Sequence, residues 1–301
     1  MSEKKMLFLF NPHAGKSRIR TKLSEILDLF VRSGFAVQVY ATQGPGDAVG
    51  AVARYGGQAD YVVVSGGDGT LNEAVNGLMQ LEKRPVLGYM PTGTTNDFAY
   101  THKLSKNMQT AAETIVAGIP EAVDLGRLND RYFTYVAGFG AFTDVSYKTP
   151  QEMKAVLGHP AYIIEGVMRL SELTPHRMRV ETEKGTLEDE FLVGLISNSV
   201  RIAGMKGLQG RHVKTDDGLF EVLLVRNPKN PLDLQQTLMG LLQPAVPSPH
   251  LVRARVKWIR FGSEAEVDWV LDGEYGGAKK EVRIENIPKA VEILKKKTFE
   301  S

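Results

Sequence analysis

The stretch YVVVSGGDGTLNEAVNG, residues 61–77, decides the fold and raises a chemical question. An apolar run leads to Ser65, glycines at 66, 67 and 69 then surround Asp68, and a helical pattern begins near Thr70. Glycines let a ligand approach the backbone closely, and the amino terminus of a helix attracts anions. This geometry favours a phosphate, yet the carboxylate at its centre would repel one.

A divalent cation between Asp68 and a phosphate would remove that conflict. Mg²⁺ is commonly held in proteins by one or two carboxylates together with phosphate oxygens and water. Asp68 is therefore predicted either to hold Mg²⁺ beside nucleotide phosphates or to act as a base toward an attacking hydroxyl. The alternative is a structural turn in which Asp68 caps the helix that follows it.

Strands and helices alternate regularly through the first third of the chain. Apolar runs predict strands at 6–10, 36–42, 61–65 and 86–91, with helical patterns between them and after them to about Gly118. Such alternation is typical of a doubly wound parallel sheet, in which helices cover both faces. We predict an α/β nucleotide-binding domain over residues 1–122.

Glycine-containing loops follow three strands of this predicted sheet, at residues 11–17, 65–73 and 90–99. The carboxyl ends of parallel strands share one edge, so these loops can line one cleft. The last loop supplies polar side chains, although its Asn96 and Asp97 could equally cap the next helix. Neither the dinucleotide fingerprint nor the Walker loop fits the glycine spacing. The prediction is a nucleotide triphosphate cleft of another type.

The pattern of the sequence changes after about residue 122. Several of the later segments alternate apolar and polar residues, which predicts antiparallel strands. Helical patterns interrupt them at 161–173 and 231–242. We predict a mainly antiparallel β-sandwich domain, or a barrel, over residues 123–285, with the C-terminal segment at about 286–301 able to return to the first domain.

Composition narrows the class of protein. The chain has 301 residues, a formal net charge of +2 and no cysteine, which argues against wholesale nucleic-acid binding, a disulfide framework and a cysteine-ligated metal. No apolar stretch reaches the length that a transmembrane helix needs. The prediction is a cytoplasmic protein that meets a membrane, if at all, from the surface.

The glycine loops, taken together and in order, resemble a known family. NPHAGK (11–16), SGGDGTLNEAVNGL (65–78) and PTGTTNDFA (91–99) are similar to the catalytic domain of the diacylglycerol kinase family, particularly its small soluble bacterial lipid kinases. Segments at 135–145, 157–162, 196–199, 213–225 and 271–274 extend the resemblance over essentially the whole chain. The resemblance implies an ATP-binding domain, a β-sandwich lipid-substrate domain and an active site in the cleft between them. It also implies ATP- and Mg²⁺-dependent phosphorylation of a lipid hydroxyl, with diacylglycerol converted to phosphatidic acid.

The resemblance further implies roles for individual residues. Glu274 matches the general base of the bacterial enzymes, and Asp68 is the rival for that role. In the loop KTDDGLF (214–220), Asp217 would give a carboxylate to a structural metal, and Lys214 and Leu219 would give carbonyl oxygens; the alternative is a plain hairpin turn. The residues expected to contact nucleotide are Asn11, Pro12, His13, Ala14, Gly15, Thr42, Gly66, Gly67, Asp68, Gly69, Thr70, Leu71, Asn72, Glu73, Thr94, Asn96 and Asp97.

Other functions stay open at this point. The acceptor could be another lipid alcohol, such as a sphingoid base, monoacylglycerol or phosphatidylglycerol. NAD kinase shares the glycine–aspartate loop, and a non-catalytic nucleotide-binding regulator could keep all the loops. Tyr135 stands where many relatives have asparagine, which bears on lipid identity.

The expected partner is a lipid substrate at a membrane surface, with no nucleic acid, and the family suggests a homodimer. Arg253, Arg255, Lys257 and Arg260 alternate on one predicted strand, and three of them share a face that could dock on an anionic bilayer or form a solvated sheet face.

Overall fold

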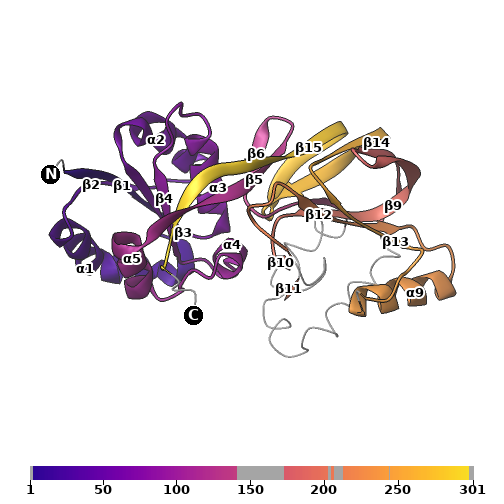
Figure 1. Cartoon of the computed structure of the whole chain (residues 1–301), viewed down its shortest axis with the longest axis horizontal. Helices are drawn as coiled ribbons and strands as arrows, with labels where there is room; N and C mark the ends of the chain where they lie inside the picture. The colour runs from indigo at the N-terminus through magenta and orange to yellow at the C-terminus, as the bar shows by residue number, and fades with distance from the viewer. Residues whose placement is uncertain (1–2, 141–172, 203–204, 207–212, 244, 298–301) are drawn as a thin grey trace. The chain divides into compact units, whose positions relative to one another are not determined.

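The computed structural model describes residues 3–140, 173–202, 205–206, 213–243 and 245–297 (Figure 1). The chain folds into two compact units. The first comprises Met1–Leu125, Arg131–Thr134 and Pro288–Ser301, and the second comprises Gly126–Asp130 and Tyr135–Ile287. The chain passes from one unit to the other at four points, two within the strands β5 (Ile119–Leu128) and β15 (Glu274–Lys295) and two at the ends of the segment Arg131–Thr134.

A parallel sheet forms the centre of the first unit. Its strands, in the order β4-β3-β1-β2, are Val86–Pro91, Tyr61–Gly66, Lys4–Phe10 and Phe35–Ala41. The register places Phe10 of β1 beside both Ala41 of β2 and Ser65 of β3. The strands therefore end level with one another, and the loops that follow them start from one edge.

Helices pack against both faces of this sheet. Val62 and Val63 are adjacent on β3, so their side chains point to opposite faces. Val63 shares a buried cluster with α1 (Arg18–Arg32) and α5 (Met108–Ala117). Val62 lies near Gly56, at the end of α2 (Asp47–Tyr55). The parallel sheet agrees with the sequence analysis, while the doubly wound topology as a whole stays a prediction.

A close helix–helix contact completes the second face. Gly77 of α3 (Asp68–Leu78) faces α2 so closely that a Cβ there would lie 2.7 Å from the Val49 carbonyl oxygen.

The last part of β15 joins the parallel sheet beside β4, where Ile293 pairs in parallel with Leu87. The remaining elements of the unit are η1 (Ala14–Ser17), η2 (Gly56–Gln58), α4 (Asp97–Thr101) and β6 (Arg131–Phe133).

The second unit is built from antiparallel strands, as its alternating sequence predicts. Its path of paired strands is β13-β12-β9-β7-β14-β15, and the two-layer sandwich stays a prediction. Their bounds are Leu251–Val256, Phe220–Arg226, Gly185–Ser197, Val136–Phe139, Trp258–Leu271 and Glu274–Lys295. A short pair, β10 (Arg201–Ile202) and β11 (Met205–Lys206), lies off this path.

Two short strands occupy the same position in the strand order of this sheet, between β9 and β14. β8 (His176–Thr182) and β7 both pair with β9 on one side and with β14 on the other. β8 takes the first part of each long neighbour and β7 takes the last part, so the two lie end to end. Phe139 of β7 packs edge-on against Phe261 and Trp269 of β14, with ring centroids 5.8 and 5.1 Å apart. This aromatic group anchors the core of the second unit.

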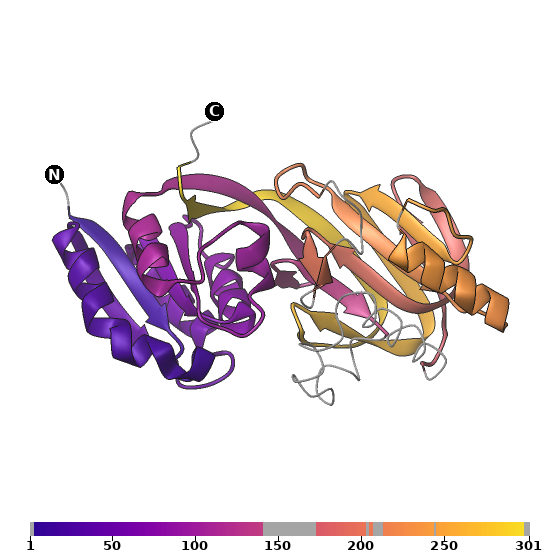
Figure 2. The ribbon, with the colours of Figure 1, turned by 90° about the horizontal axis from the view of Figure 1, so that it is seen from below.

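The helix predicted at 231–242 is confirmed as α9 (Pro231–Leu242), which Figure 2 shows in orange along the strands of the second unit. The basic segment around residues 251–260, which reads as one strand in the sequence, is divided at Lys257 between β13 and β14. The helical pattern at 161–173 lies almost wholly outside the described residues. No helix in the described part of the chain is long and apolar enough to cross a membrane.

Candidate nucleotide site and catalytic residues

The three glycine loops of the first unit meet at the edge where the strands end. Gly15 has a φ of 56°, and a Cβ on it would lie 1.8 Å from the Thr92 carbonyl oxygen. A Cβ on Gly93 would lie 2.6 Å from the Cα of Gly67. Backbones that come this close exclude side chains, so glycine is required for the loops after β1, β3 and β4 to touch.

Asp68 is the first residue of α3, yet its carboxylate caps a different helix. Its two oxygens accept backbone N–H groups of Asp97, at 3.1 Å, and Phe98, at 3.4 Å. These residues open α4, whose N–H groups lack partners within the helix. Asn96, the residue before α4, has a φ of 53° and uses its side chain on Gly93 instead. Asp68 therefore caps α4, 29 residues away, and not the helix that follows it, because the N-cap position of α3 is occupied by Gly67.

Glu73 and Asn72, both expected to contact nucleotide, also brace neighbouring segments. The Glu73 carboxylate accepts the N–H groups of Gly46, at 2.7 Å, and Ala48, at 3.2 Å, at the start of α2. The Asn72 amide donates to the Tyr132 carbonyl at 3.1 Å. Leu71, the residue before Asn72, is fully buried in the core. The side chains of Asn72 and Glu73 therefore hydrogen-bond to neighbouring segments, and the glycine turn lies in the backbone before them.

The other predicted nucleotide contacts lie at the same edge. Asn11 donates to the Thr70 hydroxyl at 3.4 Å and accepts the His13 N–H at 2.9 Å. Thr42 follows β2, and its N–H donates to the Phe10 carbonyl at 2.9 Å. His13 and Thr94 are exposed, Pro12 and Ala14 are half-buried, and Asp97 is buried. The geometry thus gathers residues from four strand ends.

Two buried hydroxyls lie at these strand ends. Ser65 Oγ, at the end of β3, and Thr92 Oγ1, after β4, have no hydrogen-bond partner within the described residues. An unpaired buried hydroxyl is costly, so such atoms are normally met by water or a ligand. A carboxylate oxygen has more than one lone pair, so accepting a backbone N–H group does not by itself prevent a carboxylate such as that of Asp68 from binding a cation. The donor set suits Mg²⁺ held through one carboxylate, phosphate oxygens and water.

Glu274 opens β15 in the second unit and is exposed. It pairs with Leu271 across the turn formed by Asp272 and Gly273, whose φ angles are 51° and 89°. An Asp-Gly pair with positive φ at both positions is the usual two-residue hairpin connection. The turn therefore presents Glu274 at a strand end and in contact with solvent.

The loop at 214–220 is held by side chains from other strands. Asp217 accepts the Leu219 N–H at 3.1 Å and forms an ion pair with Arg255. The Leu219 carbonyl accepts the Asn286 amide at 3.2 Å, and the Thr215 carbonyl accepts the Asn198 amide at 3.5 Å. The strand after this loop, β12, pairs with β9 and β13, so within the described residues the loop is a bend and not a tight hairpin, and it is anchored at both ends.

Buried oxygen atoms without donors surround this loop. They are Glu221 Oε2, Asn198 Oδ1 and Asn286 Oδ1, none of which has a partner in the described residues. Hard oxygens of this kind are the ligand type that Mg²⁺ and its bound water prefer. Among the described residues, however, no group of three or more His, Cys, Asp or Glu side chains is placed to hold a metal. Carbonyl and amide oxygens would have to complete any such site.

The Glu221–Arg255 pair was not predicted from the sequence. These residues are cross-strand partners on β12 and β13, and the Arg255 Nε lies 3.2 Å from Glu221 Oε1. Burial raises the pKa of Glu221 to about 7, although Arg255 opposes that shift. In the sequence, Glu221 is visible as an acidic residue beside an apolar run. Which residue lies opposite it depends on the register between β12 and β13.

The basic residues considered for membrane docking are largely engaged within the second unit. Arg253 donates to the Gly240 carbonyl of α9 at 3.1 Å. Arg255 forms ion pairs with Asp217 and Glu221, while Arg260 lies 3.2 Å from Glu281. Lys257 is exposed. This strand therefore offers less free positive charge than its sequence indicates.

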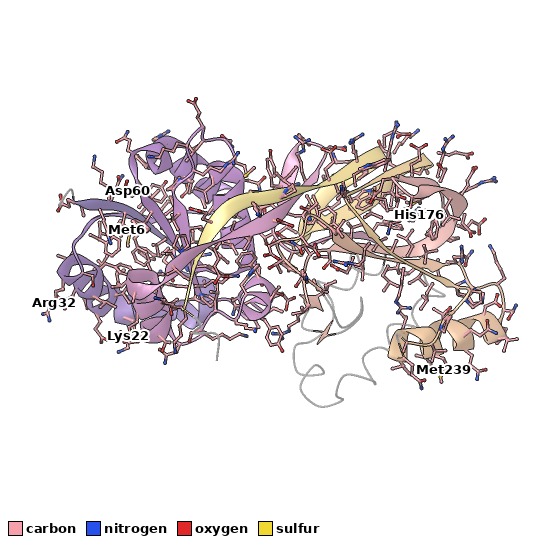
Figure 3. All side chains as sticks on the ribbon, viewed as in Figure 1. Met6, Lys22, Arg32, Asp60, His176 and Met239 are labelled. Carbon is pink, nitrogen blue, oxygen red and sulfur yellow. The ribbon has the colours of Figure 1, made fainter. Side chains whose placement is uncertain are left out.

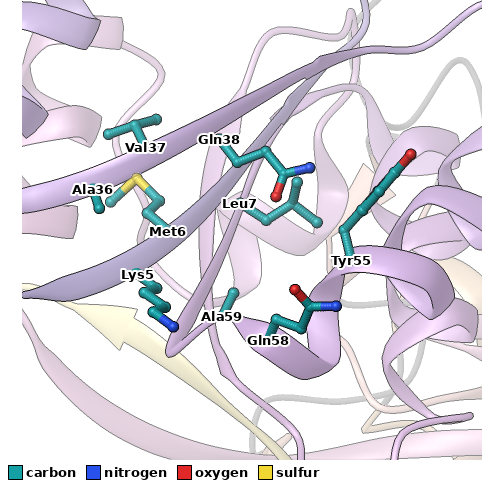
Figure 4. A pocket seen from close by; sticks show the side chains of 9 residues that line it. All are labelled: Lys5, Met6, Leu7, Ala36, Val37, Gln38, Tyr55, Gln58 and Ala59. Carbon is teal, nitrogen blue, oxygen red and sulfur yellow. The ribbon is translucent and has the colours of Figure 1, made fainter.

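A pocket of about 290 Å³ lies elsewhere in the first unit (Figure 4). It is lined by the first halves of β1 and β2, with Lys5 and Gln38 among its residues, and by Tyr55 and Gln58. The glycine loops follow the opposite ends of the same strands. This pocket is therefore separate from the candidate nucleotide site.

Comparisons with known proteins agree with this arrangement. The sequence model of the diacylglycerol kinase catalytic domain matches residues 5–128. A diacylglycerol kinase of Staphylococcus carnosus (strain TM300) is 33% identical over 277 residues, covering 91% of this chain and 90% of the relative. A diacylglycerol kinase of Bacillus subtilis (strain 168) is 29% identical over 276 residues, covering 91% of each. The crystal structure of a diacylglycerol kinase from Bacillus anthracis str. Sterne superposes with a TM-score of 0.75 at 23% identity, over 98% of this chain and 97% of that one.

The fold and the site define a kinase of the type that phosphorylates lipids. The chain belongs to the diacylglycerol kinase family and is a lipid kinase.

Proposed function

We propose that this lipid kinase transfers the γ-phosphoryl group of ATP to the hydroxyl of diacylglycerol, with Mg²⁺, and forms phosphatidic acid. The observation that carries the proposal is the meeting of the three glycine loops at one sheet edge, where buried hydroxyls lack partners among the described residues. The curated relatives named diacylglycerol kinase support the choice of acceptor.

The first unit supplies the nucleotide contacts. Backbone N–H groups of the loop at 67–70 and the amino terminus of α3 favour a phosphate through their positive dipole. Asn11, Gly15, Thr42 and Thr94 add contacts along the same edge. Bound through Asp68, Mg²⁺ would neutralise charge on the phosphates as the phosphoryl group moves.

The second unit supplies the base. The lipid hydroxyl oxygen forms a bond to the γ-phosphorus, and the bond from that phosphorus to the bridging oxygen of ADP breaks. The hydroxyl proton passes to the Glu274 carboxylate, with Asp68 as the alternative acceptor. Lys214, Asp217 and Leu219 are assigned to a second, structural cation. Positioning and charge carry the reaction, because phosphoryl transfer needs little covalent help from the protein.

Peripheral contact with a membrane from the cytoplasm is part of the proposal, because the acceptor is a lipid. α9 and the segment after it expose Leu232, Met239 and Val246; Met239 is labelled in Figure 3. Exposed apolar side chains on a helix suit the boundary of a bilayer. The homodimer that the family suggests is checked by sedimentation of the purified protein.

The test is a panel of acceptors with γ-labelled ATP, with and without Mg²⁺. Diacylglycerol, sphingosine, monoacylglycerol and phosphatidylglycerol are presented in mixed micelles, and NAD in solution. Label on diacylglycerol that requires Mg²⁺ is the expected result. Label on another lipid would change the acceptor, and label on NAD would reject the lipid assignment.

A further inference from the structure

The position of Glu274 depends on the turn directly before it. Asp272 and Gly273 join β14 to β15, and the strands pair at Leu271 and Glu274. A two-residue connection leaves no slack, so movement of the turn moves the first residue of β15. Whatever fixes Asp272 therefore fixes Glu274.

Asp272 is fixed by the start of β7. Its carboxylate oxygen Oδ1 accepts the N–H of Tyr135 at 2.9 Å and the N–H of Val136 at 3.1 Å. Its own N–H donates to the Val136 carbonyl at 2.9 Å. The residue is only 4% exposed, so these bonds form away from solvent, where a hydrogen bond is electrostatically stronger than in water. An ordinary turn aspartate would lie in water.

Tyr135 contacts the same turn from its other end. Its backbone N–H holds Asp272, and its hydroxyl lies 4.0 Å from the Cβ position of Gly273. Tyr135 is 6% exposed and its carbonyl accepts the Asn198 N–H at 3.1 Å, so the residue is itself anchored to β9. Hydrogen bonds between Asp272 and the backbone of Tyr135 and Val136 thus hold the turn, and the aromatic side chain of Tyr135 lies beside it.

We infer that Asp272 is a positioning residue, which ties the turn to Tyr135 and Val136 and so places the Glu274 carboxylate for proton transfer. The inference rests on the proposed function, because it takes Glu274 as the base. It adds that the aspartate of the LDGE segment acts through its buried hydrogen bonds and not by touching the substrate. The negative charge is secondary, since an amide oxygen can accept the same N–H groups.

The test compares Asp272→Ala with Asp272→Asn. The alanine variant loses the acceptor, and we expect kcat to fall by roughly 10- to 100-fold, because a displacement of about 1 Å can cost on the order of 100-fold. The KM for ATP should stay unchanged, because the nucleotide contacts belong to the first unit. The asparagine variant keeps Oδ1 and should recover most of the activity. Glu281→Ala is the control, since it removes only an exposed ion pair with Arg260 further along β15.

Amide hydrogen exchange provides a readout independent of turnover. The amides of Tyr135 and Val136 should exchange faster in Asp272→Ala than in wild type, and at nearly the wild-type rate in Asp272→Asn. Wild-type kcat in Asp272→Ala, with Glu274→Gln inactive, would overturn this inference and leave the proposed function standing. Equal loss in Asp272→Asn and Asp272→Ala would also overturn it, because charge would then matter more than the acceptor. A wild-type protein that labels no lipid would reject both.

Discussion

The Asp68 carboxylate accepts the backbone N–H of Asp97 at 3.1 Å, which joins the loop after β3 to the loop after β4. One side chain therefore braces the nucleotide edge and stands as the candidate ligand of Mg²⁺. These roles are chemically compatible, because a carboxylate oxygen has more than one lone pair and can accept an N–H group and bind a cation together. Under the proposed function, Mg²⁺ bound through Asp68 would remove the contradiction between a phosphate-binding turn and its central carboxylate.

Asp68→Asn should separate these two roles. The amide keeps one oxygen for α4 but loses the charge that a cation needs. We expect activity to be lost and the free energy of unfolding to fall by about 1 kcal/mol, as for a weakened helix cap. Turnover and urea unfolding measured on the same preparation check this. Normal turnover would end the assignment of Asp68.

Glu73→Ala should weaken the loop that carries Thr42. Its carboxylate caps α2 through Gly46 and Ala48, so we expect a loss of about 1–2 kcal/mol in stability and a higher KM for ATP. Glu25→Ala is the matched control, because Glu25 makes only an exposed ion pair with Lys22. Unfolding of both variants at the same urea concentration would show that the hydrogen bonds of Glu73 do not stabilise α2.

Gly15→Ala should abolish nucleotide binding. The new Cβ would lie 1.8 Å from the Thr92 carbonyl oxygen, so the loops after β1 and β4 must separate. Gly46→Ala is matched in backbone strain, since Gly46 also has positive φ, but no atom lies within 4 Å of its Cβ position. We expect the control to lose about 1 kcal/mol of stability and to keep ATP affinity. Calorimetric titration with an ATP analogue compares the two, and equal affinities would mean that the loops need not touch.

His102 should make the first unit sensitive to acid. Burial lowers its pKa from 6.5 to about 3, with a smaller contribution from Lys295. The unfolded chain therefore binds more protons than the folded chain between these pH values, so stability falls as the pH drops below 6.5. From pH 6.5 to 5 the loss from this residue is about 2 kcal/mol, at roughly 1.4 kcal/mol per unit.

His102→Phe should remove that loss. Urea unfolding at pH 6.5 and pH 5 measures it as the difference between wild type and variant, which cancels the contributions of other groups. Glu221 acts in the opposite direction, because its raised pKa makes stability increase as the pH falls from about 7 toward 4.5. An identical pH dependence in both proteins would show that His102 is not buried in its neutral form.

The sequence predicted the parallel strands of the first unit because their apolar runs are long and bounded by glycine. It also predicted where the three glycine loops lie along the chain, because each loop directly follows one of these strands. It did not predict that Asp68 caps α4 or that Glu73 caps α2, because both bonds join segments that only the tertiary fold brings together. The break at Lys257 and the Glu221–Arg255 pair depend on strand register, which periodicity alone leaves open.

Transfer of label from γ-labelled ATP to diacylglycerol tests the central claim most directly. Wild-type protein with Mg²⁺ is compared with Asp68→Asn and Glu274→Gln in the same micelles, and ATP binding is measured alongside. The account predicts labelled phosphatidic acid from the wild type and none from either variant. Bound ATP with no label on any lipid would contradict it and would identify the chain as a nucleotide-binding protein without kinase activity.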